Sequence, residues 1–319
     1  SKLGLSTGLS QHGFNMTTYN NHWYIVGAGA IGCLWAHALK QAGQDVTVVL
    51  KEHAQDSDAN TRSAQQRISL SSIDGSNTVV DINTVTVSEL ISHNSVIEHC
   101  IIATKAYDAN TALQAILPAL SSAAMVLSLC NGMGMHKAMH QQLQSRSDTI
   151  QFLLGVTSDG ALLHQPFQLS HTGIGHTFIG DYLQQKSTNT LLPPHLYLQH
   201  SQRDNIHSAL WQKMLINCVI NPLTLRYQCK NGELFANKDY SQSINALCEE
   251  LSLIANKAAP TITMTAELLF EAARDVANQT AENTSSMLKD AQLARPLELD
   301  YLNGYIVKLA KEYGLACPI

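Results

Sequence analysis

Apolar residues in the first half of the chain fall into short continuous runs separated by longer stretches of helical spacing. The runs are 22–26, 45–50, 96–104, 124–129 and 150–156. The helically spaced stretches between them are 27–41, 106–120 and 136–144. Continuous apolar runs of this length are typical of strands that are buried on both faces. Their alternation with helices predicts an α/β fold with a doubly wound, mostly parallel sheet of the Rossmann type.

Two further stretches predict β-structure of another kind. Residues 68–70 and 78–87 alternate polar and apolar side chains, which favours an antiparallel pair with one exposed face. Glycines divide residues 158–180 into short apolar pieces, which indicates a β-hairpin or an edge strand.

The spacing of apolar residues changes after about residue 200. Helical intervals then occupy 206–220, 241–258, 263–280 and 299–313. This pattern predicts a second, all-helical domain. We therefore divide the 319 residues into a leader at 1–19, a sheet domain at 20–200 and a helical domain at 201–319. The leader is polar and without periodicity, and we interpret it as a disordered tail or an added sequence.

Composition excludes several kinds of partner. Hydrophobic residues make up 45% of the chain and charged residues 14%, with a net charge of −5. Lys and Arg form no runs, so nucleic acid and anionic membranes are poor partners. No apolar stretch reaches the roughly 18 residues of a membrane-spanning helix. Seven scattered cysteines without Cys-x-x-Cys spacing indicate reduced thiols of a cytoplasmic protein, and fourteen histidines without a zinc motif predict no metal site.

A glycine motif follows the first predicted strand directly. The residues Gly27-Ala28-Gly29-Ala30-Ile31-Gly32 match G-x-G-x-x-G between a strand and an amphipathic helix, which is the context of a dinucleotide site. Gly27 would permit the tight turn, Gly29 the close approach of a pyrophosphate, and Gly32 the packing of helix on strand. The alternative is an ordinary glycine turn.

The end of the second strand indicates which dinucleotide binds. Sites for NAD carry Asp or Glu there, which accepts a hydrogen bond from the ribose 2′-hydroxyl. Here the strand is followed by Lys51, a cation suited to the 2′-phosphate of NADPH, although Glu52 comes next. The alternative for Lys51 is an ordinary solvated lysine.

Polar residues also follow the next two buried strands. Lys105 and Asn131 come shortly after the runs at 96–104 and 124–129. Because open α/β sheets bind ligands outside the carboxyl ends of their strands, we expect both side chains near a ligand. The alternatives are a lysine that starts a helix and an asparagine in a turn.

A polar stripe interrupts the most apolar predicted helix, which begins near residue 206. Lys213, Asn217 and Asn221 are spaced four residues apart, so they fall on one slowly drifting line along that helix. Burying an unpaired polar group costs about 2–7 kcal/mol, so we expect the stripe to line a ligand cavity. A buried lysine has a lowered pKa, which suits proton donation near neutral pH. The alternative is a polar network that satisfies itself, and Asn221, before Pro222, is expected at a helix end or kink.

Two polar positions near the C-terminus have plain structural alternatives. Ser285 or Ser286 would suit a helix N-cap. Glu298 opens the last long helical stretch, where the helix dipole favours a carboxylate.

Taken together, these stretches resemble the ketopantoate reductases, in the group with a 6-phosphogluconate-dehydrogenase-like C-terminal domain. The matching stretches span almost the whole chain: 27–32, 104–106, 131–134, 211–224, 231–234, 282–290 and 298–304. The most specific are the Lys-x-x-x-Asn-x-x-x-Asn-Pro-Leu-Thr run and the Ser-Ser-Met-Leu-x-Asp run. The resemblance implies NADPH-dependent reduction of 2-dehydropantoate (ketopantoate) to D-pantoate in pantothenate and coenzyme A synthesis.

The resemblance also implies roles for single residues. Lys213 would polarise the substrate ketone and donate a proton, with Glu298 beside it and beside the nicotinamide ribose. Asn131 would bridge cofactor and substrate. Further substrate contacts are implied for Asn217, Asn221, Asn231, Ser286 and, less directly, Glu250. Further cofactor contacts are implied for Ala28, Ala30, Ile31, Lys105 and Ala161.

The chain departs from the family pattern in two places. Leu225 and Arg226 follow Thr224, where the family usually has a small residue. Leu297 replaces a common threonine before Glu298. Both changes bear on the shape of the substrate cavity.

Two other hypotheses stay open. A related NADP-dependent dehydrogenase of another short 2-oxo or 3-hydroxy acid would keep the glycine motif and Lys213 but change the region of Ser286 and Asn221. A non-catalytic NADP(H)-binding regulator would need Lys213 or Glu298 to be lost, and both are present. The expected partner is a small-molecule 2-oxo acid, and the sequence leaves a homodimer open.

Overall fold

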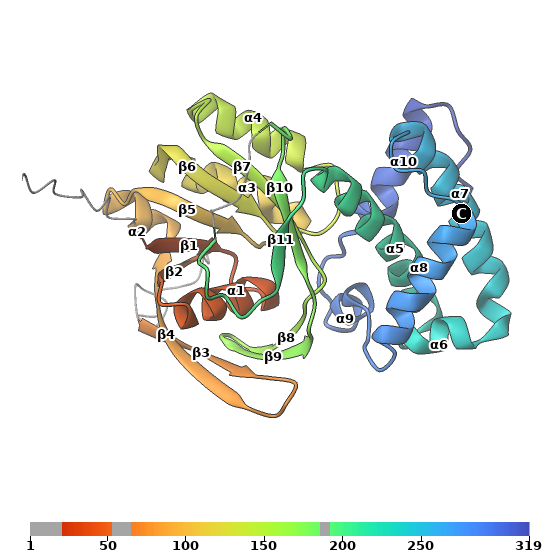
Figure 1. The fold of residues 1–319 in the computed structure, drawn as a ribbon, viewed down its shortest axis with the longest axis horizontal. Coiled ribbons are helices and arrows are strands. Elements are labelled where there is room, and N and C mark those ends of the chain that lie inside the picture. The colour runs from red at the N-terminus through yellow and green to blue at the C-terminus, as the bar shows by residue number, and fades with distance from the viewer. Residues whose placement is uncertain (1–20, 53–64, 186–191, 319) are drawn as a thin grey trace, which may run out of the picture.

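A computed structural model describes residues 21–52, 65–185 and 192–318 of the chain (Figure 1). The expected leader at 1–19 lies outside these residues. Within them the strands form one 11-stranded sheet in the order β11-β10-β7-β6-β5-β1-β2-β4-β3-β9-β8. The strands are β1 His22–Val26, β2 Asp45–Leu50, β3 Gln65–Ser71, β4 Asn77–Thr86, β5 Ile97–Ile102, β6 Leu120–Ser128, β7 Gln151–Thr157, β8 Gly160–Gln165, β9 Gln168–Gly173, β10 Thr177–Asp181 and β11 His200–Gln202.

The middle of the sheet has the predicted parallel arrangement. Strands β7, β6, β5, β1, β2 and β4 lie side by side and run parallel. Strand β1 has β2 on one side and β5 on the other, so the chain order reverses there. In open α/β sheets, the carboxyl ends of strands at such a reversal open on the ligand crevice. The helices of this part are α1 Ala30–Gln41, α2 Val87–Ser92, α3 Ala106–Ile116 and α4 His136–Arg146.

The outer strands curl the sheet around α1. The predicted antiparallel pair is present as β3 and β4, and the predicted hairpin as β8 and β9. The hairpin lies beside β3 at one edge of the sheet, whereas β10 returns to pair with β7. Strands β3, β4, β8 and β9 all contact α1 (Figure 1). This enclosure explains why α1 is apolar nearly all round, with Trp35 fully buried.

The second part of the chain is helical, as predicted. Its helices are α5 Ile206–Tyr227, α6 Asn231–Ala236, α7 Ser241–Ala258, α8 Ala266–Gln279, α9 Ser286–Gln292 and α10 Asn303–Glu312. Helix α5 packs against β7 and β10 of the sheet and against α6, α7, α8 and α9, so it joins the two parts. The α/β fold with a C-terminal helical region is thus confirmed. We keep the division into domains at 20–200 and 201–319 as a proposal.

Several predicted bounds were wrong. The helix predicted at 106–120 ends at Ile116, because a 3-10 turn containing Pro118 follows and Leu120 already begins β6. The helix predicted at 206–220 continues through Pro222 to Tyr227, so Asn221 lies inside it rather than at its end. Helices α2, α6 and α9 have six or seven residues each, which is too short for a periodic signal.

Helix α5 continues through Pro222 because another helix satisfies the carbonyl group that proline leaves without a partner. Proline has no N–H, so the carbonyl of Cys218, four residues earlier, loses its helical hydrogen bond. The side-chain amide of Asn303, at the start of α10, donates a 3.1 Å hydrogen bond to that oxygen. This bond ties the helix that carries Lys213 to the segment that follows Glu298.

We expect Asn303→Ala to lower the free energy of unfolding by about 1–3 kcal/mol, the usual cost of leaving a buried acceptor unpaired. In a Pro222→Ala background the loss should be smaller, because the new N–H at position 222 can bond to the Cys218 carbonyl. Urea unfolding of the four proteins of this mutant cycle measures both losses. Equal losses in the two backgrounds would show that Asn303 does not act through this carbonyl.

Candidate functional site

The glycine motif forms the turn between β1 and α1, and its three glycines serve different purposes. A Cβ on Gly27, whose φ is +108°, would lie 2.8 Å from the Ala103 carbonyl oxygen. A Cβ on Gly32 would lie 1.9 Å from the Gly27 carbonyl oxygen, so close packing requires both glycines. A Cβ on Gly29 would meet only the Ala103 oxygen, at 4.0 Å, so the surface over Gly29 is open. No side chain caps α1 there, which leaves its first N–H groups available to an anion.

Lys51 and Glu52 follow β2 at the same edge of the sheet. Lys51 Nζ lies 3.4 Å from Asp108 Oδ1, and both side chains are exposed. Glu52 Oε1 accepts a 2.8 Å hydrogen bond from the Ser88 N–H, in the first turn of α2. Hydrogen bonds from Ser88 lower the pKa of the Glu52 carboxyl. Glu52 is therefore engaged by α2, which leaves Lys51 as the charged group offered by this strand end.

Lys105 connects the sheet with the helical part through two carboxylates. It precedes α3, and its amine forms ion pairs with Asp290 on α9 and, at 3.5 Å, with Glu298 Oε2. Glu298 Oε1 also accepts a 2.8 Å hydrogen bond from the Ala106 N–H. The two carboxylate side chains are only 8% and 7% exposed. Burial alone would lower the pKa of Lys105, but the charges of Glu298 and Asp290 outweigh it and raise that pKa.

Lys213 is anchored at the end of β6, the strand next to β5 in the sheet. Its amine donates a 2.7 Å hydrogen bond to Asn131 Oδ1, in the loop that follows β6. Burial lowers the pKa of Lys213 to about 8, although the negative charges of Glu298 and Asp159 oppose that shift. The amine can therefore gain and lose its proton near neutral pH, as a general acid must.

The loop that carries Asn131 packs against the turn that carries Glu298. The Met133 N–H donates a 2.8 Å hydrogen bond to the Tyr301 carbonyl oxygen. Gly132 has a φ of +81°, and a Cβ there would lie 2.4 Å from the same oxygen. This close packing places Asn131, the hydrogen-bond acceptor of Lys213, in the same region as the Glu298 carboxylate.

The other predicted substrate residues lie on three helices. On α5, Asn217 is half-buried and Asn221 is buried. Asn231, at the start of α6, donates a 2.9 Å hydrogen bond to Thr280 Oγ1. Its Oδ1 atom is buried and has no hydrogen-bond partner among the described residues. Ser286 begins α9 and is exposed.

The sequence allowed either Ser285 or Ser286 to be a helix N-cap, and the structure shows that their surroundings differ. Ser285 is buried, and its Oγ accepts hydrogen bonds from the Leu288 N–H at 3.2 Å and from Thr224 Oγ1 at 2.7 Å. It is therefore the N-cap of α9. This arrangement leaves the exposed Ser286 free of the capping role. Ala161, on β8, packs against the core around α1 together with Ala28 and Ile31.

The described contacts join some predicted site residues and not others. Lys105, Asn131, Lys213 and Glu298 belong to one cluster at the carboxyl edge of the sheet. No described contact joins Lys51, Asn231 or Ser286 to that cluster. Asp290 belongs to it but was not among the predicted site residues. The available signal was the acid that closes the Ser-Ser-Met-Leu-x-Asp run.

Within the described ranges, no helix combines the length and the apolar character needed to cross a membrane. The same ranges contain no group of three or more His, Cys, Asp or Glu side chains placed to hold a metal ion. The seven cysteines are free thiols.

Comparison with known proteins identifies the family. Residues 23–184 match the family "Ketopantoate reductase PanE/ApbA", and residues 205–319 match "Ketopantoate reductase PanE/ApbA C terminal". The chain belongs to the ketopantoate reductase family. It is 31% identical to the 2-dehydropantoate 2-reductase of Vibrio cholerae over 304 residues, which cover 92% of this chain and 93% of the relative. The corresponding Escherichia coli O157:H7 protein is 29% identical, with 92% and 90% covered.

Solved structures share the fold. A ternary structure of D-mandelate dehydrogenase with NADH and anilino(oxo)acetate superposes with a TM-score of 0.80 at 23% identity, covering 93% of this chain and 94% of that one. A 2-dehydropantoate 2-reductase from Geobacter metallireducens superposes with a TM-score of 0.78 at 20% identity, covering 93% and 95%. At these identities the likeness concerns the fold alone.

Proposed function

We propose that the chain reduces 2-dehydropantoate to D-pantoate with NADPH, a step of pantothenate and coenzyme A synthesis. The observation that carries this proposal is the Lys213 amine, whose pKa lies near 8 and which is held 2.7 Å from Asn131 at the carboxyl edge of the sheet. A ketone reductase needs such a proton donor beside its nucleotide site. The curated relatives that match nearly the whole chain are named 2-dehydropantoate 2-reductase.

The residues at the sheet edge fit a dinucleotide phosphate. The open surface over Gly29 gives a pyrophosphate access to the first N–H groups of α1. Ala28, Ala30 and Ile31 complete this turn, and Ala161 packs beside it. Lys51 would pair with the 2′-phosphate, while Asn131 and Glu298 would hold the nicotinamide end. When bound, NADPH supplies the hydride for the reaction.

The chain's own residues handle the proton. Lys213 polarises the ketone by hydrogen bonding to its oxygen, and it gives a proton to that oxygen as the carbonyl carbon is reduced. Asn131 holds the amine through its side-chain oxygen. Glu298 contributes negative charge that keeps a useful fraction of the lysine protonated. The neutral amine that remains then takes up a proton from solvent.

The remaining polar groups suit a short hydroxylated 2-oxo acid. Asn217 and Asn221 follow Lys213 along α5 and would orient the substrate oxygens. Asn231, at the start of α6, would contribute a further contact to the substrate. Ser286, exposed at the start of α9, would donate to the substrate carboxylate.

We expect Lys51→Asp to weaken NADPH binding by roughly ten- to hundredfold, because a hydrogen bond to a charged group is worth about 1.5–3 kcal/mol. NADH binding should change far less, because aspartate can accept a hydrogen bond from the ribose 2′-hydroxyl. Titration of protein fluorescence with both nucleotides measures the difference. Asp108→Asn is the matched control, since it removes the partner of Lys51 and should not weaken NADPH. Equal losses for the two nucleotides in Lys51→Asp would contradict recognition of the 2′-phosphate.

The pH dependence should have opposite signs in the two directions of reaction. We expect kcat/KM for reduction to fall as pH rises through about 8, because neutral Lys213 has no proton to give. For oxidation of D-pantoate, kcat/KM should rise over the same range, because the amine must be neutral to accept a proton. Initial rates across this range test both limbs. The same trend in both directions would rule out Lys213 as the titrating group.

The substrate is tested by measuring kcat/KM for NADPH oxidation with ketopantoate and a panel of other 2-oxo acids. The proposal expects ketopantoate to have the highest value. A higher value for another acid would instead favour the related dehydrogenase, and tight NADPH binding without turnover of any acid would favour a regulator.

We also propose a cytoplasmic homodimer. A structure of the same fold, from Staphylococcus aureus, is described as a dimeric ketopantoate reductase; its TM-score is 0.71 at 16% identity. Sedimentation of the purified protein tests the proposal, and a species of monomer mass at working concentration would contradict it.

A further inference from the structure

A buried carboxylate lies at the end of the strand next to β6. Asp159 follows β7 by two residues, so it occupies the same edge of the sheet as the loop of Asn131. Its side chain is only 1% exposed. None of the reaction steps described above uses this group.

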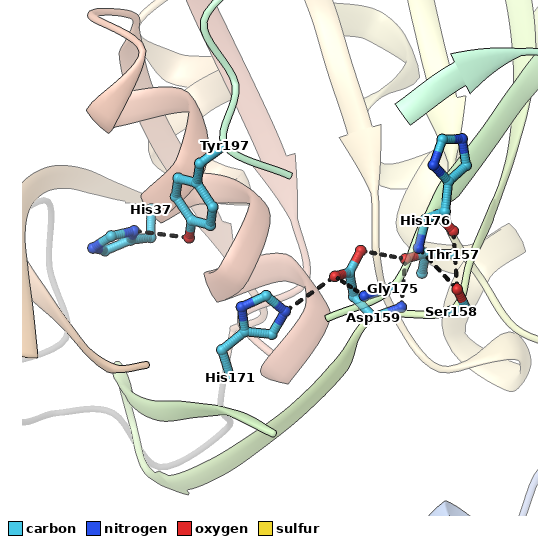
Figure 2. A network of polar contacts seen from close by, with 8 residues as sticks. All are labelled: His37, Thr157, Ser158, Asp159, His171, Gly175, His176 and Tyr197. Carbon is cyan, nitrogen blue, oxygen red and sulfur yellow. Dashed lines mark hydrogen bonds and ion pairs between the residues drawn. The ribbon is translucent and has the colours of Figure 1, made fainter. Parts of the chain in front are cut away.

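Three hydrogen bonds fix the Asp159 carboxylate (Figure 2). Oδ1 accepts hydrogen bonds of 3.0 Å from the Gly175 N–H and 3.0 Å from His171 Nε2 on β9, with the ring in the tautomer that donates. Oδ2 accepts a 3.1 Å bond from Thr157 Oγ1 at the end of β7. Burial would raise the pKa of Asp159, but these partners overcome it and keep the pKa below its ordinary value. The carboxylate is therefore a fixed negative charge at neutral pH.

This fixed charge lies on the β7 side of Lys213. Helix α5, which carries the lysine, packs directly against β7 and β10. The lysine amine is anchored to the end of β6, the strand paired with β7. Glu298 belongs to the helical part, so the charges of one carboxylate from each part of the chain act on the amine.

The hydrogen bonds alone do not require an ion at this position. An asparagine could keep the bonds from Gly175 and His171 through its Oδ1, while its Nδ2 could donate to Thr157 Oγ1. Burying an ionised carboxylate is much costlier than burying an amide with the same partners. The charge itself therefore needs an explanation.

Resting on the proposed function, we propose that Asp159 is a positioning residue that acts through Lys213. Its buried carboxylate, fixed by His171, Thr157 and Gly175, supplies negative charge at the β7 edge that keeps the proton donor charged. It does not touch the substrate, because its side chain is enclosed.

Other titratable groups around this lysine and carboxylate are accounted for. Glu298 is paired with Lys105, which also pairs with Asp290. Burial raises the pKa of the Cys130 thiol, at the end of β6, to about 11, so it stays neutral. Tyr197 stays neutral as well, because burial and the charge of Asp159 raise its pKa. Among the charges that act on Lys213, Asp159 is thus the one that can be removed without disturbing the Lys105 cluster.

The test is the pH profile of kcat/KM for ketopantoate reduction in Asp159→Asn. The alkaline limb, set by Lys213, should move to lower pH, while the KM for NADPH stays near the wild-type value. Two controls should keep the wild-type limb. His171→Gln retains a donor and leaves Asp159 charged. Asp181→Asn neutralises a buried acid on β10, which pairs with Leu153 near the start of β7, far from the edge that carries Asp159. An unmoved limb in Asp159→Asn, or equal shifts in all three variants, would overturn the proposal.

Failure of the proposed function can be distinguished from failure of this inference. If the wild-type protein reduces no 2-oxo acid, the function fails, and NMR titration of the Lys213 amine still shows whether Asp159→Asn lowers its pKa. If Asp159→Asn does not fold, Asp159→Ser also removes the charge, and the same shift is expected. An unchanged titration of Lys213 in a folded neutral variant sinks the inference whatever the activity.

Discussion

Replacing Lys213 with alanine is expected to lower the turnover of ketopantoate by roughly 10²–10⁴, the usual contribution of a general acid. The change removes the amine that donates a hydrogen bond to Asn131 Oδ1, and water can then donate to that oxygen. It leaves the glycine turn of β1 and α1 untouched, so NADPH should still bind. Steady-state rates and nucleotide titration of the same preparation measure both properties.

Lys40→Ala is the matched control for this change. Lys40 lies near the end of α1 and pairs with Asp45 at 3.5 Å, on the surface of the sheet part. Its removal should leave turnover within the scatter of the wild type. A Lys213→Ala protein with normal turnover would show that the proton comes from another group.

Gly29→Ala and Gly32→Ala are expected to fail in different ways. Alanine at Gly29 meets no atom closer than 4.0 Å, so stability should fall by at most about 1 kcal/mol, the penalty of alanine at an N-cap. The same methyl group occupies the surface that a pyrophosphate would approach. Overpacking of about 1–3 kcal/mol there corresponds to a roughly ten- to hundredfold weaker NADPH affinity.

Alanine at Gly32 instead creates a clash inside the protein, 1.9 Å from the Gly27 carbonyl oxygen. We expect a loss of about 1–3 kcal/mol or more in the free energy of unfolding, because the helix must move away from the strand. Urea unfolding and NADPH titration of both variants separate the two effects. Unchanged NADPH affinity in Gly29→Ala would show that the phosphates bind elsewhere.

The sequence predicted the architecture well where elements are long and periodic. Residues 241–258 form a helix with the predicted bounds, because its apolar face is regular and buried. The parallel strands were detectable because both of their faces are apolar. The polar stripe of α5 was detectable for the opposite reason, since Lys213 and the two asparagines interrupt an apolar helix.

Other features depend on contacts between distant residues and left no local signal. The bond from Asn303 that lets α5 pass Pro222 joins residues 85 apart in the chain. The curl of the sheet around α1 depends on a hairpin, distant in the chain, whose strand β9 pairs with β3. Asp159 is an ordinary acid in sequence, and only its burial and its partners distinguish it.

The central claim is that this site transfers the hydride of NADPH to ketopantoate. The most direct test mixes the enzyme, loaded with one equivalent of NADPH, with ketopantoate at a pH below the pKa of Lys213. The loss of NADPH absorbance and the formation of D-pantoate are then followed in a single turnover. We predict equal amounts of NADPH consumed and D-pantoate formed, with the reaction slowed in Lys213→Ala. Stable NADPH absorbance in the presence of saturating ketopantoate, in an enzyme that binds the nucleotide, would contradict the claim.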